Sequence, residues 1–268
     1  MNKKTLYGQA HTRVVTQPAG VRIGGRTVTR GQAGIIAKIQ MMCEEESLKA
    51  IEQLYPDYHW VFKDSRHIGV RLVVAKVSDM YHEQLVNDVD WEVRRAVAKA
   101  SLTHHITLKD DEDWRVRFIV ARASTTYHEQ LVNDEHWSIR AAVANKSDKY
   151  HEQLKDDEDE DVRLAVANAS TKYHEQLMGD SSWLVRATVA KANPTYHAQL
   201  AVDKHRLVRE AVAKASTKYH AVLVKDKRWE VRLAIAKAST KYHDILKDDV
   251  DTDVREAVEN YKEKLCVK

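Results

Sequence analysis

Arginine, aspartate and histidine recur along this chain at one fixed spacing, and such side chains can form ion pairs, hold phosphates or bind metal ions. Each arginine follows Val or Ile, and the step to the next is 23 residues. An aspartate stands six residues before each arginine from Asp88 onward. Because nine copies share one phase, they predict an array of 23-residue repeats. The arginines are Arg71, Arg94, Arg117, Arg140, Arg163, Arg186, Arg209, Arg232 and Arg255.

The arginine column has two interpretations. A row of guanidinium groups can act as a ladder for phosphates. Alternatively, each arginine pairs with an aspartate of a neighbouring repeat and holds the array together. The second interpretation is favoured, because Arg94 lies beside Ala98, a position at which eight copies carry alanine and a neighbouring helix is expected to approach closely.

A column of histidines runs along the same repeats. A metal ion needs its ligands within ~2.1 Å, and residues one repeat apart are too far from each other for that. We therefore expect one structural hydrogen bond per repeat and no metal site. A further hypothesis is that mild acid, from about pH 7.5 to 5.5, charges these rings and loosens the array. The histidines are His59, His82, His105, His128, His151, His174, His197, His220 and His243.

The motifs of common catalytic sites are missing from the sequence. It has no Walker A loop, GxSxG, HExxH or supported Cys–His pair. The acidic runs 110–113 and 156–161 lack the Gly and closing Glu of a calcium loop. We expect no catalytic residues, no cofactor and no small-molecule substrate. The two cysteines, Cys43 and Cys266, exclude a disulfide framework and fit a reducing cytoplasm. No apolar run approaches the ~18–20 residues of a membrane span, so no membrane partner is expected.

One copy, residues 81–103, shows which elements must position these side chains. Asp88 is predicted to be the N-cap of a helix, with its carboxylate accepting from the first turn. The helix then buries an apolar face that includes Val93, Val97 and Ala100. Residues 81–85 are too few for a second full helix and predict a single turn, of 3-10 type. A copy this small cannot fold alone, so the copies must stack.

The repeated pattern L-x-x-D-x-x-x-x-V-R-x-A-V-A, with Asn-Pro-Thr at 193–195, resembles the leucine-rich repeat variant (LRV) family. The spacing from Asp to Val-Arg also resembles HEAT repeats. The match covers residues 58 to about 260. The resemblance implies a right-handed superhelix of α-helices alternating with 3-10 turns. A founding LRV protein carries an iron–sulfur cluster in a cysteine-rich N-terminal part, and this function is not expected here because those cysteines are missing.

The two ends differ from the middle. Residues 1–42 hold seven Lys or Arg and no Asp or Glu. Gly24 and Gly25 between two β-prone triplets predict a hairpin within this module. The predicted fold class is therefore an all-α, right-handed α-solenoid of about nine repeats, with a small hairpin-containing N-terminal module. The predicted segments are a basic Gly-rich module (1–42), a degenerate capping repeat (43–57), the array (58–260) and a C-terminal cap (261–268).

Two columns on the outer face of the helix are candidates for binding a partner. A helical wheel places Arg95, Lys99 and Glu92 toward water. In the Lys99 column, six of eight copies are basic and none is acidic. Apolar residues occupy four copies of the Arg95 column, and exposed apolar groups can form a protein interface. Coverage of these residues by adjacent turns is the alternative. The predicted binding residues are Lys76, Lys99, Arg122, Lys191, Lys214 and Lys237, with Leu72, Phe118, Leu164 and Leu233. A solvated mixed surface is the competing interpretation of the basic column.

Five tryptophans share the third helical position: Trp91, Trp114, Trp137, Trp183 and Trp229. They can stack on nucleic-acid bases or pack over the arginine stem of the next repeat, and packing is favoured. The predicted function is a non-catalytic scaffold in the cytoplasm that binds a macromolecular partner, with a protein favoured. The alternative is a nucleic-acid binder that uses the basic column and a basic N-terminal arm. The arm residues are Lys3, Lys4, Arg13, Arg22, Arg26 and Arg30.

Overall fold

The computed structural model describes residues 20–23, 26–41 and 59–266 of the 268-residue chain. Two compact units make up the chain, residues 1–101 and 102–268. The predicted capping repeat at 43–57 lies outside the described residues, as do the turn glycines Gly24 and Gly25.

The first unit begins with a β-hairpin and continues into the first repeats. Strands β1 (Val21–Ile23) and β2 (Arg26–Val28) pair antiparallel, with Ile23 opposite Arg26, as the sequence predicted. Helix α1 (Arg30–Met41) follows, and the Gln32 side chain accepts from the backbone N–H of Thr29. The repeat helices of this unit are α3 (His59–Phe62), α4 (Ile68–Val77), α5 (His82–Leu85) and α6 (Trp91–Ala100), with the 3-10 turn η2 (Asp79–Tyr81).

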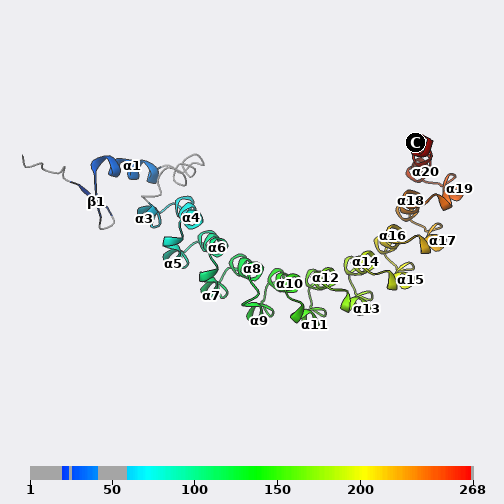
Figure 1. Cartoon of the computed structure of the whole chain (residues 1–268), viewed down its shortest axis with the longest axis horizontal. Coiled ribbons are helices and arrows are strands. Elements are labelled where there is room, and N and C mark those ends of the chain that lie inside the picture. The colour runs from blue at the N-terminus through cyan, green and yellow to red at the C-terminus, as the bar shows by residue number, and fades with distance from the viewer. Residues whose placement is uncertain (1–19, 24–25, 42–58, 267–268) are drawn as a thin grey trace, which may run out of the picture. The chain divides into compact units, whose positions relative to one another are not determined.

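The second unit is a regular succession of long and short helices (Figure 1). The long helices lie along its concave side and the four-residue helices along its convex side. The long helices are α8 (Trp114–Ala123), α10 (Trp137–Lys146), α12 (Glu160–Ala169), α14 (Trp183–Ala192), α16 (Arg206–Ala215), α18 (Trp229–Ala238) and α20 (Thr252–Cys266). The short helices are α7 (His105–Leu108), α9 (His128–Leu131), α11 (His151–Leu154), α13 (His174–Leu177), α15 (His197–Leu200), α17 (His220–Leu223) and α19 (His243–Leu246).

Most short helices are entered through a 3-10 turn. The turns are η3 (Leu102–His104), η4 (Asp148–Tyr150), η5 (Thr171–Tyr173), η6 (Pro194–Tyr196), η7 (Thr217–Tyr219) and η8 (Thr240–Tyr242). The Ser170 hydroxyl accepts from the N–H of Lys172, and the Asn193 amide oxygen accepts from Thr195. The predicted single turn is thus a 3-10 turn followed by one α-turn.

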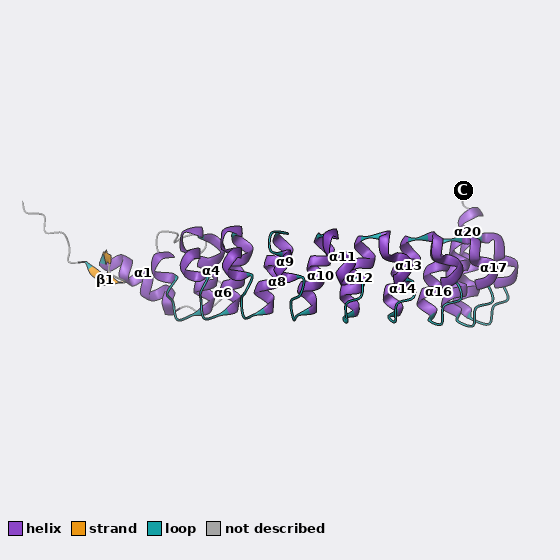
Figure 2. Cartoon of the chain, turned by 90° about the horizontal axis from the view of Figure 1, so that it is seen from below, coloured by secondary structure: helices purple, strands orange, loops and turns teal. Residues whose placement is uncertain are grey.

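Stacking of the copies buries a continuous core. Val162, Val166 and Leu177 show how each copy contributes two valines from the long helix and one leucine from the short helix, all at most 1% exposed. Consecutive long helices of unit 2 pack directly on one another from α8 to α20. In Figure 2 the loops that join the helices follow one another along the edges of this unit. The predicted α-solenoid with an N-terminal hairpin is confirmed.

Two details of the predicted helix are wrong. The N-cap is Asp90, whose side chain accepts from the N–H of Glu92, and not Asp88. Asp88 instead accepts from the N–H of Asp90 itself, because two further residues separate it from Trp91, where the helix begins. Ala100 is exposed at the end of the helix, although the sequence placed it on the buried face.

Candidate interaction surface

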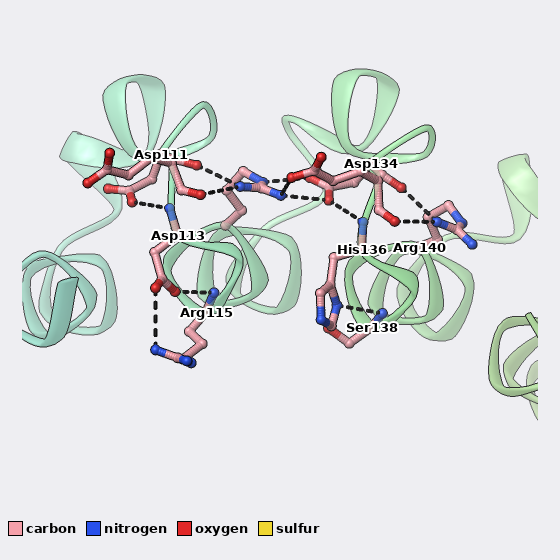
Figure 3. Close-up of polar contacts among 10 residues, drawn as sticks. Asp111, Asp113, Arg115, Asp134, His136, Ser138 and Arg140 are labelled. Atoms are coloured by element: carbon pink, nitrogen blue, oxygen red, sulfur yellow. Dashed lines mark hydrogen bonds and ion pairs between the residues drawn. The ribbon is translucent and has the colours of Figure 1, made fainter.

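A ladder of arginine–aspartate pairs connects successive repeats. Arg117 donates from Nε and Nη2 to the two carboxylate oxygens of Asp134, at 2.7 and 2.9 Å. Its Nη1 donates to the carbonyl of Asp111, which precedes the same helix (Figure 3). The same bidentate contact, with two hydrogen bonds from the guanidinium to the carboxylate, recurs in Arg71–Asp88, Arg140–Asp157, Arg163–Asp180, Arg186–Asp203, Arg209–Asp226 and Arg232–Asp249. The predicted structural role of this column is therefore confirmed for these pairs, and their guanidinium groups are already occupied.

The paired charges shift each other's proton affinity. The hydrogen bond to Asp203 raises the pKa of Arg186 above its usual value, although burial opposes the shift. Burial alone would raise the pKa of Asp203, but hydrogen bonds from Arg186 and from the N–H of His205 outweigh it and leave the pKa lowered. Both groups are thus charged at neutral pH, as a stable ion pair requires.

The histidine column makes the structural hydrogen bonds that its spacing predicted. His174 is fully buried, and its Nε2 lies 2.8 Å from the carbonyl oxygen of Ala167 near the end of the preceding long helix. Because a carbonyl can only accept, Nε2 carries the hydrogen. The same contact is made by His82, His128, His151, His197, His220 and His243, at 2.6–2.8 Å. Among the described residues no group of three His, Cys, Asp or Glu side chains is placed to hold a metal ion.

Three of the predicted binding residues meet in one groove of unit 1. Leu72, Lys76 and Lys99 line a cavity of about 450 Å³ between α4 and α6. Arg95 and Glu92 complete its walls. Lys76 and Lys99 are exposed, whereas Leu72 and Arg95 are half-buried between the two helices. The groove therefore combines the apolar side chains of Leu72 and Ala96 with both basic and acidic groups.

In unit 2 the basic column is exposed and the apolar column is half-buried. Arg122, Lys191, Lys214 and Lys237 are exposed on the long helices, as predicted. Lys214 is bound to Glu210 on its own helix at 2.6 Å. Phe118, Leu164 and Leu233 are half-buried, so they are less exposed than their place on the outer face predicted. Phe118 is contacted by side chains of its own helix: its ring lies edge to face with that of Trp114, with centroids 6.5 Å apart, and the Arg122 guanidinium lies 5.6 Å from its centre.

The tryptophans contact histidines that sequence reasoning did not assign to them. Trp114 stacks on His136 with ring centroids 4.0 Å apart and planes at 7°, and Trp183 stacks on His205 at 4.7 Å. Each of these histidines is the N-cap residue of the next long helix. A histidine 22 residues after the tryptophan was the available signal in both cases. Trp137 and Trp183 remain 41% and 37% exposed, so they contribute apolar area to the surface.

The predicted basic arm is described only in part. Arg22, Arg26 and Arg30 are exposed, and the Arg26 guanidinium lies 4.9 Å from the centre of the Trp60 ring. This cation–π contact connects the hairpin to α3. Lys3, Lys4 and Arg13 lie outside the described residues. In the part of the chain that the structure describes, no helix has the length and apolar character needed to cross a membrane.

Comparison with known proteins bears on the fold. No protein-family model matches the chain, and no curated protein matches it. A solved structure of a leucine-rich repeat variant, described as having a novel repetitive structural motif, aligns with a TM-score of 0.57 and 26% identity. The alignment covers 78% of this chain and 87% of that chain. The repeat array is thus structurally similar to the leucine-rich repeat variant, as its sequence pattern predicted.

Proposed function

We propose that this protein is a non-catalytic scaffold that binds a protein partner on the face formed by its long helices. The observation that carries the proposal is the groove between α4 and α6, which is lined by the apolar Leu72 together with the exposed Lys76 and Lys99. Such a groove suits a partner segment with apolar side chains and acidic neighbours. The cytoplasmic location expected from the cysteine content is part of this proposal.

The same chemistry extends along unit 2. Lys191 and Lys237 stand exposed on α14 and α18, and Leu164 and Leu233 are half-buried beside the packed helices. Stacking requires the buried valines and alanines but does not require lysines on the open face. These side chains are therefore available for a partner.

The test reverses the charge of the two groove lysines and measures whether a protein partner is still retained. Lys76→Glu/Lys99→Glu is compared with Lys218→Glu/Lys241→Glu, which makes the same change in charge on the 3-10 turns. A protein that co-purifies with the native chain and with the control, but not with the groove variant, supports the proposal. Its affinity for the purified variant is expected to fall at least about ten-fold. Equal retention by both variants would reject the groove as the site.

Nucleic-acid binding is the second candidate, favoured by one observation. Residues 181–241 carry 13 Lys or Arg against 4 Asp or Glu, and Lys191, Lys214 and Lys237 share one helix face within this segment. Binding to labelled duplex or single strand should then weaken steeply with salt and should fall when residues 1–42 are removed. Affinity weaker than about micromolar at low salt rejects this candidate.

A further inference from the structure

The exposed residues that precede the long helices of unit 2 change the sign of their charge at one point. We call this row the loop edge and define it as the residues two positions before each long helix. Along the chain these residues are Glu112, Glu135, Glu158, Ser181, Lys204, Lys227 and Val250. All seven are exposed. Acidic residues therefore occupy one side of Ser181, and the two basic residues occupy the other.

The wider sequence follows the same reversal. Residues 102–180 contain 17 Asp or Glu and 10 Lys or Arg, whereas residues 181–241 contain 4 and 13. These two segments of unit 2 thus carry opposite net charges, and the remaining residues 242–268 carry 8 Asp or Glu and 5 Lys or Arg. Long-range attraction between oppositely charged segments of two molecules is strong at low ionic strength and screened by salt.

Directly after the two basic loop-edge residues, the helices begin without a side-chain cap. Helices α12 and α14 begin with Asp159 and Ser182, whose side chains cap the first turn. Helices α16 and α18 begin with His205 and Arg228, and neither makes a side-chain cap. A lost cap costs about 1 kcal/mol, and cations at a helix N-terminus oppose the helix dipole. Local choices that disfavour folding are expected where a surface has another role.

Contacts within the chain leave the relevant charges open to a partner. Lys204 and Lys227 make no ion pair among the described residues. The Glu135 and Glu158 side chains are 85% and 89% exposed. Glu135 accepts a hydrogen bond from Arg117 at 3.2 Å, and Glu158 lies 3.6 Å from Arg140. Each of these arginines is also held by two hydrogen bonds to an aspartate, and both glutamates keep most of their surface open to solvent.

We propose that two copies of this chain pair along the loop edge, antiparallel, about a two-fold axis at Ser181. Equal repeat steps on either side of Ser181 bring Glu158 opposite Lys204 of the second copy and Glu135 opposite Lys227. In an isologous interface each such contact occurs twice, so all four lysines of the two copies face a glutamate, and the remaining glutamate of each copy, Glu112, falls opposite Val250. Neighbouring loop-edge residues are about 8–10 Å apart, as packed helices are, so the register of both copies is the same.

The tryptophans two positions after the loop-edge residues are also paired by the two-fold axis at Ser181. Trp183 lies two positions after Ser181, so it faces Trp183 of the second copy. By the same symmetry, Trp137 of one copy lies opposite Trp229 of the other. Trp137 and Trp183 are the two tryptophans of the array that are more than one-third exposed, and burial of such rings is a common source of interface stability. The open face of the long helices is not used, so both copies keep it free.

A second copy suits this edge better than a nucleic acid does. A phosphate backbone along the loop edge would be attracted by Lys204 and Lys227 but repelled by Glu135 and Glu158. The edge of a second copy satisfies both halves at once. The sign reversal at Ser181 is therefore the feature that selects this partner.

The test is sedimentation of the full chain at about 100 µM in about 50 mM and 500 mM salt. We expect dimers at low salt and a dissociation constant at least about ten-fold weaker at high salt. Lys204→Glu/Lys227→Glu and Glu135→Lys/Glu158→Lys should each be monomeric alone, because like charges then face each other. Mixed one to one, they should form a heterodimer, because opposite charges face each other again. The control Lys218→Glu/Lys241→Glu should remain dimeric.

Thermal unfolding confirms that every variant is folded before it is sedimented. A wild-type chain that stays monomeric at low salt overturns the proposal, as does a mixture of the two reversed variants that stays monomeric. Equal weakening of the dimer in the control would also overturn it. A monomer that binds duplex through Lys204 and Lys227 would assign the edge to nucleic acid instead.

Discussion

Arg140 of one repeat and Asp157 of the next are joined by two parallel hydrogen bonds, with Nε–Oδ2 and Nη2–Oδ1 distances of 2.7 and 2.8 Å. Both side chains are about nine-tenths buried, at 10% and 9% exposure. The same carboxylate also accepts from the N–H of Asp159, the residue that caps α12. One aspartate thus connects the stacking of two repeats with the start of a helix.

Replacement of Asp157 by alanine should destabilise the array strongly. The change removes the partner of Arg140 and leaves a mostly buried cation unpaired, which costs about 3–5 kcal/mol in fully buried pairs and about 2–3 kcal/mol here because some solvent reaches the pair. Urea unfolding followed by circular dichroism measures the loss. The control is Glu158→Ala, since Glu158 lies 3.6 Å from the same arginine but is 89% exposed. A control that loses as much stability as Asp157→Ala would contradict this assignment.

Acid should unfold the array through the same ladder. The pKa of Asp249 is lowered by its hydrogen bond from Arg232, and those of Asp203 and Asp226 are lowered by their arginines against an opposing effect of burial. A carboxyl group whose pKa is lower in the folded chain contributes stability that is complete above its unfolded pKa of about 3.9. That stability is lost as the pH falls through the lower folded pKa. The melting temperature should therefore drop below about pH 4, and an unchanged value between pH 5 and 2 would disprove the prediction.

The buried histidines should tolerate glutamine better than alanine. In His174→Ala the Ala167 carbonyl loses its buried donor and a cavity replaces the ring, so we expect a loss of about 2–4 kcal/mol. In His174→Gln the amide can donate to the same carbonyl, and the loss should be roughly half as large. Urea midpoints of the two variants check the order. If glutamine is no better than alanine, the hydrogen bond contributes little and the ring acts by packing alone.

The sequence predicted the repeat, its period and the structural role of the arginine column because a stacking contact must recur in every copy. The same recurrence led to the wrong assignment of Asp88 as the N-cap of the helix. Asp88 is constant because Arg71, 17 residues earlier, binds it, and a helical wheel of a single copy does not contain that contact. The true cap position carries Asp90 in one copy and Arg228 in another, so its role was hidden by its variation.

The candidate surface was only partly predictable for a related reason. The exposure of Lys99 follows from its angle on one helix, and the structure agrees. The half-burial of Leu72 and Phe118 depends on the conformations of the side chains around them, which the wheel does not give. The contact of Trp114 with His136 likewise crosses from one repeat to the next.

Restoring the missing cap of α18 should stabilise the array. Arg228 stands where α6 and α12 carry Asp90 and Asp159, and its side chain does not cap the helix. Arg228→Asp supplies an acceptor for the first turn and places an anion at the helix N-terminus, for a gain of about 0.5–1 kcal/mol. The substitution also removes a 3.6 Å contact with the Glu230 carboxylate. This loss should be small, because α6 already combines Asp90 with Glu92 at the equivalent positions.

The matched control is Arg228→Ala, which removes the cation without adding a cap. Thermal and urea unfolding should rank the aspartate variant above the alanine variant, because only aspartate provides the hydrogen-bond acceptor. The order separates the cap from simple relief of charge at the helix end. Equal stability of the two variants would show that α18 gains nothing from a side-chain cap, and that the missing cap at Arg228 carries no cost for the fold.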